Sequence, residues 1–277
     1  MWGGAPWPAD LQFGRHVMST EVSPLSRISL AVEPPVARIT LNNAPLNVID
    51  LAMMEELGSA LADIEAEPKI STVVLRGDGD CFSAGVDVVA HAPGKVTAML
   101  QKFHAVIRAL VASRKVTVAA VHGNCLGGGA ELAMMCDIVI TTADATWGFP
   151  EISLGCFPPI AATALGALIG HKRAADLMLT GATMLGTEAA EIGLATRAVT
   201  ADNMDAAIGQ ALEHLQKQSP VALAIAKKAI YSWDSIHFDK GLARAEKIYL
   251  EELMKTEDAR EGVRAFLEKR NPRWQGR

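Results

Sequence analysis

Short apolar runs alternate with longer segments of helical pattern through the first half of the chain, and no other feature restricts the possible folds as strongly. The two runs within 27–42 alternate apolar with polar residues, as an antiparallel pair of strands does. Three later runs are nearly continuous in apolar residues, as buried strands are: STVVLRG, KVTVAAV and DIVITT. Between the runs lie two predicted helices, at 51–66 with Asp50 as N-cap and at 94–113. The sequence therefore predicts an α/β fold.

The chain becomes mostly helical after Pro159. The helices that we expect there cover 159–169, 171–180, 187–192, 201–217, 220–233 and 236–269. The last of them is apolar along one side, at Leu242, Ala245, Tyr249 and Leu253, so we expect it to pack on the core or on another subunit.

Three regions follow from these patterns. Residues 1–25 are rich in Gly, Pro and Trp without any periodicity, and we interpret them as a flexible N-terminal extension. Residues 26–200 form the α/β core, and residues 201–277 form a C-terminal helical region. Met18 is an alternative start that the sequence does not decide.

Composition and charge exclude several classes of protein. A net charge of −5 without a basic arm argues against a nucleic-acid binder. The longest uncharged stretch, 152–170, is interrupted by Pro158 and Pro159, and the N-terminus lacks the pattern of a signal peptide, so we expect no membrane span and no secretion. The four cysteines form no C-x-x-C pair, so we expect no disulfide framework, no metal site and a cytoplasmic protein.

Two glycine-bearing turns follow the predicted strands and are the first candidates for a functional site. One is FSAGVD at 82–87, and the other contains three glycines at 127–129 and opens a helix. Glycines let a backbone come close to a ligand, and the free N–H groups of a new helix can stabilise an oxyanion. Since glycines also serve ordinary tight turns, the turns alone do not identify a site.

Two glutamates strengthen this interpretation. Glu131 lies three residues after Gly128 in an otherwise apolar stretch, and Glu151 stands between Pro150 and Ile152 in a hydrophobic loop. A lone glutamate at a helix start is usually a surface acid. A carboxyl group removed from water, however, has the raised pKa of a general acid or base. Two acids beside an oxyanion site suit the addition of water across a double bond conjugated to a carbonyl.

Several motifs, taken together and in order, resemble the enoyl-CoA hydratase/isomerase (crotonase) superfamily from Arg27 to Arg277. The matching segments are ITLNNAPLNVID, CFSAGVD, VAAVHGNCLGGGAELAMMCDIVI, FPEISLG and TEDAREGVRAFLEKRNPRWQGR. The resemblance implies a β-β-α spiral with a C-terminal helical trimerisation region, and a homotrimer or dimer of trimers. It also implies an acyl-CoA thioester as substrate and no separate cofactor, because coenzyme A is part of that substrate.

The resemblance also implies roles for particular residues. The backbone N–H groups of Val86 and Gly128 would form the oxyanion hole, Glu131 would activate water, and Glu151 would exchange the proton at the α-carbon. The positions that match the coenzyme A and substrate site are Pro45, Leu46, Ala84, Asp87, Val88 and Gly127. Phe266 and Lys269 on the last helix match positions that contact the adenine end of a coenzyme A bound to a neighbouring subunit. Because both glutamates are present, a hydratase is favoured over an isomerase.

One segment departs from the common pattern of the family. Where many hydratases have a Gly-Gly and a Gln-Arg after the second glutamate, residues 154–163 read LGCFPPIAAT. This variant, together with PLNVID near the start, is similar to cyclohexadienoyl-CoA hydratases. It puts a straight-chain enoyl substrate in doubt.

Two alternatives stay open. Other reactions of the same family, such as isomerisation or hydrolysis of a thioester or C–C bond, are compatible with the glutamates. Alternatively, residues 123–127 fit the G-x-C-x-G pattern of a nucleophile elbow with Cys125 as nucleophile, in an α/β-hydrolase that would need a histidine such as His214 or His237. That interpretation leaves CFSAGVD and FPEISLG unexplained.

Overall fold

The computed structural model of the chain describes residues 25–92, 94–231 and 234–276. The predicted extension, apart from Leu25, lies outside these residues, as does Met18. Leu25 packs against the hydrophobic core. The boundaries at 26, 200 and 277 stay predictions.

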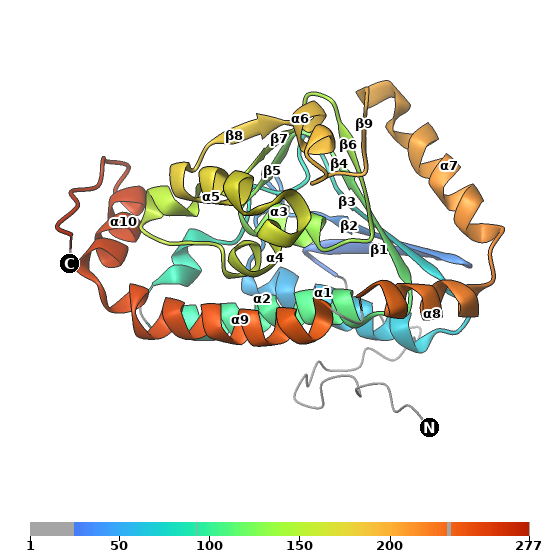
Figure 1. Ribbon diagram of the computed structural model, residues 1–277, viewed down its shortest axis with the longest axis horizontal. Helices are drawn as coiled ribbons and strands as arrows, with labels where there is room; N and C mark the ends of the chain where they lie inside the picture. The colour runs from blue at the N-terminus through green and yellow to red at the C-terminus, as the bar shows by residue number, and fades with distance from the viewer. Residues whose placement is uncertain (1–24, 93, 232–233, 277) are drawn as a thin grey trace.

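Six strands form the main sheet, in the order β1-β2-β3-β4-β6-β9 (Figure 1). They are Ile28–Glu33 (β1), Val36–Leu41 (β2), Thr72–Gly77 (β3), Val116–Val121 (β4), Ile138–Thr142 (β6) and Arg197–Val199 (β9). β1 and β2 pair antiparallel, and all later neighbours pair parallel. The first five strands confirm the expected ones, whereas β9 has no counterpart among the predicted strands.

The helices follow the predicted pattern closely up to α8. They are Leu51–Ala66 (α1), Val96–Ala112 (α2), Gly128–Met134 (α3), Pro159–Ile169 (α4), His171–Thr180 (α5), Gly186–Glu191 (α6), Met204–Gln216 (α7), Pro220–Tyr231 (α8), Asp234–Glu251 (α9) and Glu257–Leu267 (α10). Short 3₁₀ turns occupy Val88–His91 (η1), Pro150–Leu154 (η2), Ala201–Asn203 (η3) and Leu253–Lys255 (η4). Asp50 caps α1 as expected, because its side chain accepts a 2.8 Å hydrogen bond from Met53 N. None of the helices in the described part of the chain is both long and apolar enough to cross a bilayer.

Alternate residues of the main sheet enter two separate hydrophobic cores, as the pleat of a strand requires. Leu75 and Val121 face the larger core, which α1, α2 and α3 cover. Val74 and Val118 face the opposite side and pack with Ile208 of α7. Burial on both faces explains why β3 and β4 are almost continuous in apolar residues.

A second sheet of three short strands lies beside the first, in the order β5-β7-β8. Its strands are Asn124–Leu126 (β5), Thr146–Gly148 (β7) and Thr183–Leu185 (β8). The chain passes from β4 through residues 122–123 into β5 and then into α3, and after β6 it passes in the same way into β7. These repeated strand–strand–helix steps form the spiral that the family resemblance implies, and they bring the ends of β5 and β7 together.

The single helix expected at 236–269 is wrong, because the chain divides there into α9, η4 and α10. Thr256 has an extended backbone, and its hydroxyl accepts a 3.1 Å hydrogen bond from Ala259 N, which starts a new helix. α10 ends at Leu267, and Lys269 has a positive φ of 53°. Lys269 therefore follows the last helix instead of lying on it.

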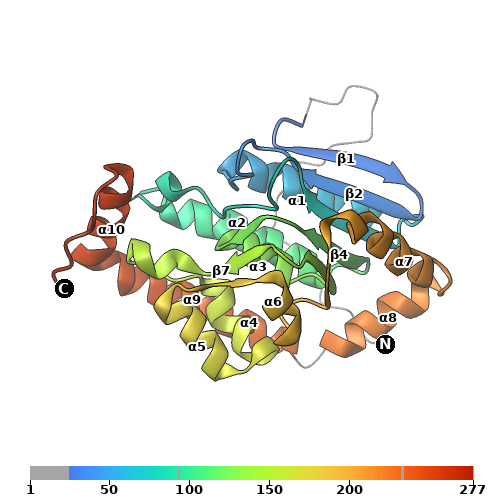
Figure 2. The ribbon, with the colours of Figure 1, turned by 90° about the horizontal axis from the view of Figure 1, so that it is seen from above.

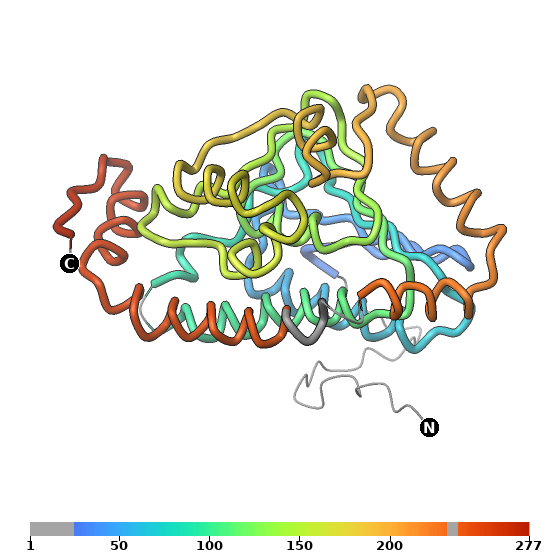
Figure 3. Tube along the Cα trace, in the orientation of Figure 1, coloured from blue at the N-terminus to red at the C-terminus, as the bar shows by residue number. Residues whose placement is uncertain are grey.

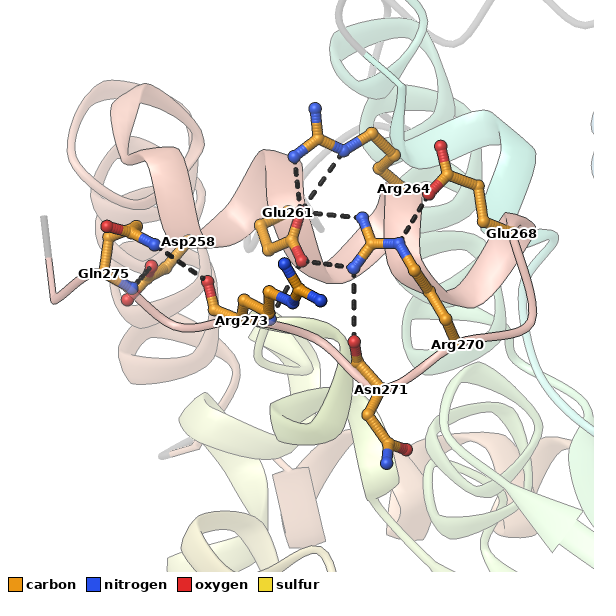
Figure 4. A network of polar contacts seen from close by, with 8 residues as sticks. All are labelled: Asp258, Glu261, Arg264, Glu268, Arg270, Asn271, Arg273 and Gln275. Carbon is orange, nitrogen blue, oxygen red and sulfur yellow. Dashed lines mark hydrogen bonds and ion pairs between the residues drawn. The ribbon is translucent and has the colours of Figure 1, made fainter.

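The residues after α10 fold back along that helix (Figure 4). The carboxylate of Glu261, a buried residue on α10, accepts hydrogen bonds from Arg264, from Arg270 and from the backbone N–H of Arg273. Hydrogen bonds from these guanidinium groups hold the pKa of Glu261 well below its usual value. This network fixes the C-terminal segment against α10.

α9 returns to the first part of the chain and lies beside α2 and α4 (Figures 2 and 3). Leu242, Ala245 and Tyr249 of α9 are buried, and Leu253 of the following η4 packs against the core, which confirms that the predicted apolar side packs on the body of the protein. The placement of α9 matters for the site described next, because Tyr249 forms part of its wall.

Candidate active site

The two glycine-bearing turns lie side by side, because one isolated backbone bridge joins the first turn to the strand that leads into the second, while another joins the first turn to the segment before α1. Ser83 bridges to Cys125 in β5, and Val86 bridges to Ile49. The hydroxyl of Ser83 donates to Asn47 O at 2.7 Å and accepts from Gly85 N at 3.1 Å. Gly85 has a φ of 105°, and a Cβ there would lie 2.9 Å from the carbonyl of Leu126, so only glycine allows this close approach.

The N–H groups of Val86 and Gly128 are the two that the resemblance assigns to an oxyanion hole. In the bridge to Ile49, Gly85 O and Asp87 N make the hydrogen bonds, so the N–H of Val86 points to the other side. Gly128 is the first residue of α3, where no carbonyl of the helix is available to its N–H. A Cβ on Gly128 would lie 3.3 Å from Val86 N. The two N–H groups, which have no acceptor among the described residues, therefore border the same small space.

Glu131 is buried in α3, one turn after Gly127. One carboxylate oxygen, Oε1, accepts hydrogen bonds of 2.9 Å from both Ile160 N and Ala161 N at the start of α4. Burial raises the pKa of Glu131, and these two donors act against that rise because they stabilise the charged form.

Glu151 lies in η2, and its carboxylate rests against the backbone of Gly127. A Cβ on Gly127 would lie 2.5 Å from Glu151 Oε1. Its other oxygen, Oε2, is buried and has no hydrogen-bond partner among the described residues. Burial raises the pKa of Glu151, and the charge of Glu131 raises it further. Of the two carboxyl groups, Glu131 is therefore the one that ionises first.

A cavity of about 80 Å³ joins these groups. Of the residues named from the sequence, it is lined by Glu131, Glu151, Val86, Gly128, Ala84, Val88 and Gly127. The structure thus brings together both acids, both backbone donors and three of the expected substrate contacts. Among the described residues, no group of three or more His, Cys, Asp or Glu is placed to hold a metal ion.

The other expected contacts lie outside the cavity wall. Pro45 and Leu46 are exposed, and Leu46 O accepts a hydrogen bond from Ala84 N, which places this segment at the edge of the site. Asp87 caps η1 by accepting from Val89 N. Phe266 and Lys269 are exposed and do not line the cavity of their own chain, although α10 packs against η1 and η2.

The segment that departs from the family pattern forms much of the wall. Leu154, Phe157, Pro158 and Pro159 all line the cavity. A larger cavity of about 660 Å³ lies between α4, α9 and the end of α3, and Phe157 lines both spaces. The larger cavity contains neither glutamate, so the candidate chemistry belongs to the smaller one.

Three polar residues of the wall are not predicted as site residues from the sequence: His91, His104 and Tyr249. Their positions in the sequence carry no local signal, since His104 and Tyr249 occupy the buried faces of amphipathic helices. Only the packing of α9 on α2 brings His104 and Tyr249 to the same cavity.

The nucleophile-elbow alternative does not fit this arrangement. Cys125 is fully buried, and burial raises the pKa of its thiol well above the ordinary value. His214 is exposed on α7 and does not line the cavity. The side chain of His237 lies outside the described part of the chain. Cys125 packs in the larger hydrophobic core.

Comparison with known proteins agrees with the geometry. The family model described as enoyl-CoA hydratase/isomerase matches residues 32–277. A cyclohexa-1,5-dienecarbonyl-CoA hydratase of Thauera aromatica is 34% identical, over 94% of this chain and 100% of its own. A probable enoyl-CoA hydratase of Bacillus subtilis is 34% identical, over 91% of this chain and 100% of its own. The crystal structure of an enoyl-CoA hydratase from Mycobacterium avium superposes with a TM-score of 0.83 at 25% identity, over 91% of this chain and 100% of that one.

Proposed function

The chain belongs to the enoyl-CoA hydratase/isomerase family, and from this premise we propose that it adds water to the conjugated double bond of an enoyl- or dienoyl-CoA thioester. The observation that carries the proposal is the placement around one cavity of the buried Glu131, of Glu151 with its buried Oε2, and of two backbone N–H groups. An isomerase needs one acid to move a proton, whereas hydration uses two, so the pair favours a hydratase.

The backbone donors stabilise the charge that develops on the thioester oxygen. When water attacks the β-carbon, electrons move through the conjugated system to the carbonyl oxygen and form an enolate. We assign this stabilisation to the N–H groups of Val86 and Gly128, a role that the closeness of these two residues supports. Donors that are fixed before the reaction stabilise such a charge without having to reorganise.

The two glutamates divide the work of proton transfer according to their surroundings. Glu131, whose carboxylate receives two backbone N–H groups, starts ionised and takes a proton from the attacking water. Glu151, which is buried without a partner for Oε2, starts protonated and gives its proton to the α-carbon. The water oxygen bonds to the β-carbon, the enolate collapses, and the product is a 3-hydroxyacyl-CoA. The glutamates then exchange one proton with solvent and return to their starting state.

Coenzyme A itself would bind along the edge of the site, at Pro45, Leu46, Asp87 and Val88, with Phe266 and Lys269 contributed by a neighbouring subunit of a trimer or a dimer of trimers. The exposure of Phe266 and Lys269 supports a role outside their own chain. We place the enzyme in the cytoplasm, since Cys81, Cys125, Cys136 and Cys156 are all unpaired. The reaction needs no cofactor.

The acyl group that we favour is short or cyclic. The cavity of about 80 Å³ has room for roughly five to eight water-sized groups, at about 10–15 Å³ each, which is too little for a long acyl chain. The residues that depart from the common pattern, 154–163, form much of its wall. The Thauera relative, whose name specifies a cyclic dienoyl thioester, supports the same class of substrate.

A hydration assay across straight-chain, branched and cyclic dienoyl-CoA thioesters tests this proposal. We expect hydration of at least one thioester, with kcat/KM highest for short or cyclic acyl groups. The loss of absorbance of the conjugated thioester gives the rate. A protein that isomerises or hydrolyses these thioesters, but adds no water to any of them, would contradict the proposal.

The activity should depend on pH through both carboxyl groups. Because burial raises the pKa of Glu131 and of Glu151, the acid limb of the kcat/KM profile should lie above the usual carboxyl range, where Glu131 loses activity on protonation. The alkaline limb should reflect ionisation of Glu151. Rates measured from pH 4 to pH 10 in buffers of constant ionic strength check this bell shape. A profile that is flat from pH 5 to pH 9 would contradict it.

A further inference from the structure

A buried histidine of α2 contacts a partly exposed glutamate of α9 next to the cavity. His104 Nδ1 lies 2.6 Å from Glu246 Oε1, and Arg108 donates to the same oxygen at 3.0 Å. The imidazole of His104 is completely shielded from solvent and lines the cavity. Its second nitrogen, Nε2, has no hydrogen-bond partner among the described residues.

The protonation state of this histidine follows from its surroundings. Burial lowers the pKa of His104, and although Glu246 acts in the opposite direction, the net shift keeps the imidazole neutral. A neutral imidazole carries one N–H, and Glu246 holds it at Nδ1. Nε2 is therefore a bare acceptor that requires a donor from whatever occupies the cavity.

Tyr249 supplies a second unpaired group to the same cavity. It lies three residues after Glu246 on α9, and its buried hydroxyl lies beside the thiol of Cys156 but makes no hydrogen bond of good geometry with any described residue. The ring packs edge-on against Phe157, with 5.2 Å between ring centroids, so the hydroxyl is held in place by the segment that departs from the family pattern. Burial raises the pKa of Tyr249, which keeps the hydroxyl protonated and able to donate.

Buried polar groups in folded proteins almost always find partners, in the protein, in ordered water or in a ligand. Besides Glu151 Oε2, which the proposed mechanism uses, two such groups line this cavity, and a ligand that fills it has to satisfy both. The ligand must accept a hydrogen bond from Tyr249 Oη and donate one to His104 Nε2. A hydroxyl group does both through one oxygen atom. A keto or carboxylate oxygen only accepts, and it would leave His104 Nε2 unpaired.

We propose that the acyl group of the natural substrate carries a hydroxyl group beyond the reacting double bond, bound between Tyr249 and His104. This inference rests on the proposed function, since it assumes an acyl-CoA thioester in the cavity. It narrows the substrate class to hydroxylated acyl groups and makes Tyr249 and His104 residues that determine specificity. The reaction that supplies the substrate would have to be one that introduces this hydroxyl group into the acyl chain or ring, or one that keeps a hydroxyl group already present there.

Binding of saturated thioesters tests the inference without any turnover. The probes are cyclohexanecarbonyl-CoA and its 2-, 3- and 4-hydroxy forms, with 4-oxocyclohexanecarbonyl-CoA as an acceptor-only probe, all measured by titration calorimetry. Two new hydrogen bonds should tighten binding of the 3- or 4-hydroxy form by about tenfold to a hundredfold over the unsubstituted ring. The 2-hydroxy form is a comparison, because its hydroxyl stands on the β-carbon, where hydration itself would place one. The oxo form, which cannot donate a hydrogen bond, should bind only slightly more tightly than the unsubstituted ring.

Two variants connect the gain to the residues. Tyr249→Phe and His104→Phe should each reduce the ratio of affinities, hydroxylated ring over unsubstituted ring measured in the same variant, to less than about threefold. Tyr249→Phe should leave Tm unchanged or slightly higher, because the lost hydroxyl makes no hydrogen bond of good geometry with the described residues. Lys247→Ala is the matched control, since Lys247 is exposed on the same helix and should keep the full gain.

Three results would overturn the inference. The first is equal affinity for all the rings. The second is a gain in affinity that only the 2-hydroxy form shows or that the oxo form shows equally, and the third is a gain that Tyr249→Phe leaves intact. The hydration assay with unsaturated thioesters is scored separately. If hydration is absent while the hydroxyl gain and its loss in Tyr249→Phe are present, the proposed function fails and the hydroxyl site stands.

Discussion

Replacement of either candidate glutamate by glutamine, Glu131→Gln or Glu151→Gln, should lower kcat for hydration by about 10²- to 10⁴-fold, the range in which general acid–base catalysis contributes. Glutamine keeps the size of the side chain but can neither take a proton from water nor give one to the α-carbon. The acyl-CoA should still bind, because the backbone donors and the cavity wall remain. Steady-state rates together with the binding constant of a saturated acyl-CoA give both quantities.

The stability of these variants separates lost chemistry from lost folding. Both carboxyl groups have a raised pKa in the folded state, so the folded protein binds their protons more tightly than the unfolded chain does. The free energy of unfolding therefore falls as pH rises above the usual carboxyl pKa. For Glu151→Gln, which removes the charge, Tm relative to wild type should therefore rise between pH 5 and pH 9. Glu188→Gln, at an exposed position in α6, should match wild type in rate. Wild-type rates in either active-site variant would refute the assignment.

The second large effect should come from a single methyl group at the candidate oxyanion hole. In Gly128→Ala the new Cβ would lie 2.6 Å from Val86 Cγ2 and 3.3 Å from Val86 N, in the space that borders both N–H groups. Loss of one donor of an oxyanion hole typically costs 10²- to 10³-fold in kcat. We therefore expect a fall in kcat of about that size, measured with the best substrate of the panel.

A matched glycine elsewhere serves as control for this substitution. Gly209 lies inside α7, and a Cβ there would meet nothing within 4 Å. Gly209→Ala should keep the wild-type rate and raise stability slightly, because alanine favours a helix over glycine. If Gly128→Ala is well folded by circular dichroism and turns over like Gly209→Ala, the N–H groups of Val86 and Gly128 do not act on the thioester oxygen.

The parts of the fold that sequence reasoning predicts are those with a strong local pattern. β3 and β4 are evident from continuous apolar runs, and Asp50 marks the start of α1. The three-residue strands β5, β7, β8 and β9 are too short to show a period, and they exist because the chain places them beside partners. The break between α9 and α10 depends on the cap at Thr256, which one threonine in a helical pattern does not reveal.

The site divides in the same way. Glu131, Glu151 and the two turns sit in motifs that the sequence shows directly, and the structure brings them to one cavity. His104 and Tyr249 have no such motif, because the contact between His104 and Glu246 joins residues 142 positions apart. The packing of two helices creates this part of the site, and no local sequence pattern records it.

That long-range contact means that two separate parts of the chain build the wall of the cavity. The turns and glutamates come from residues 82–151, whereas Tyr249 and the partner of His104 come from α9. Substitutions on α9 can therefore change this part of the wall while both glutamates stay in place. During synthesis, the acids are present long before the wall opposite them, so the newly made chain has a complete pocket only after its last helices have docked.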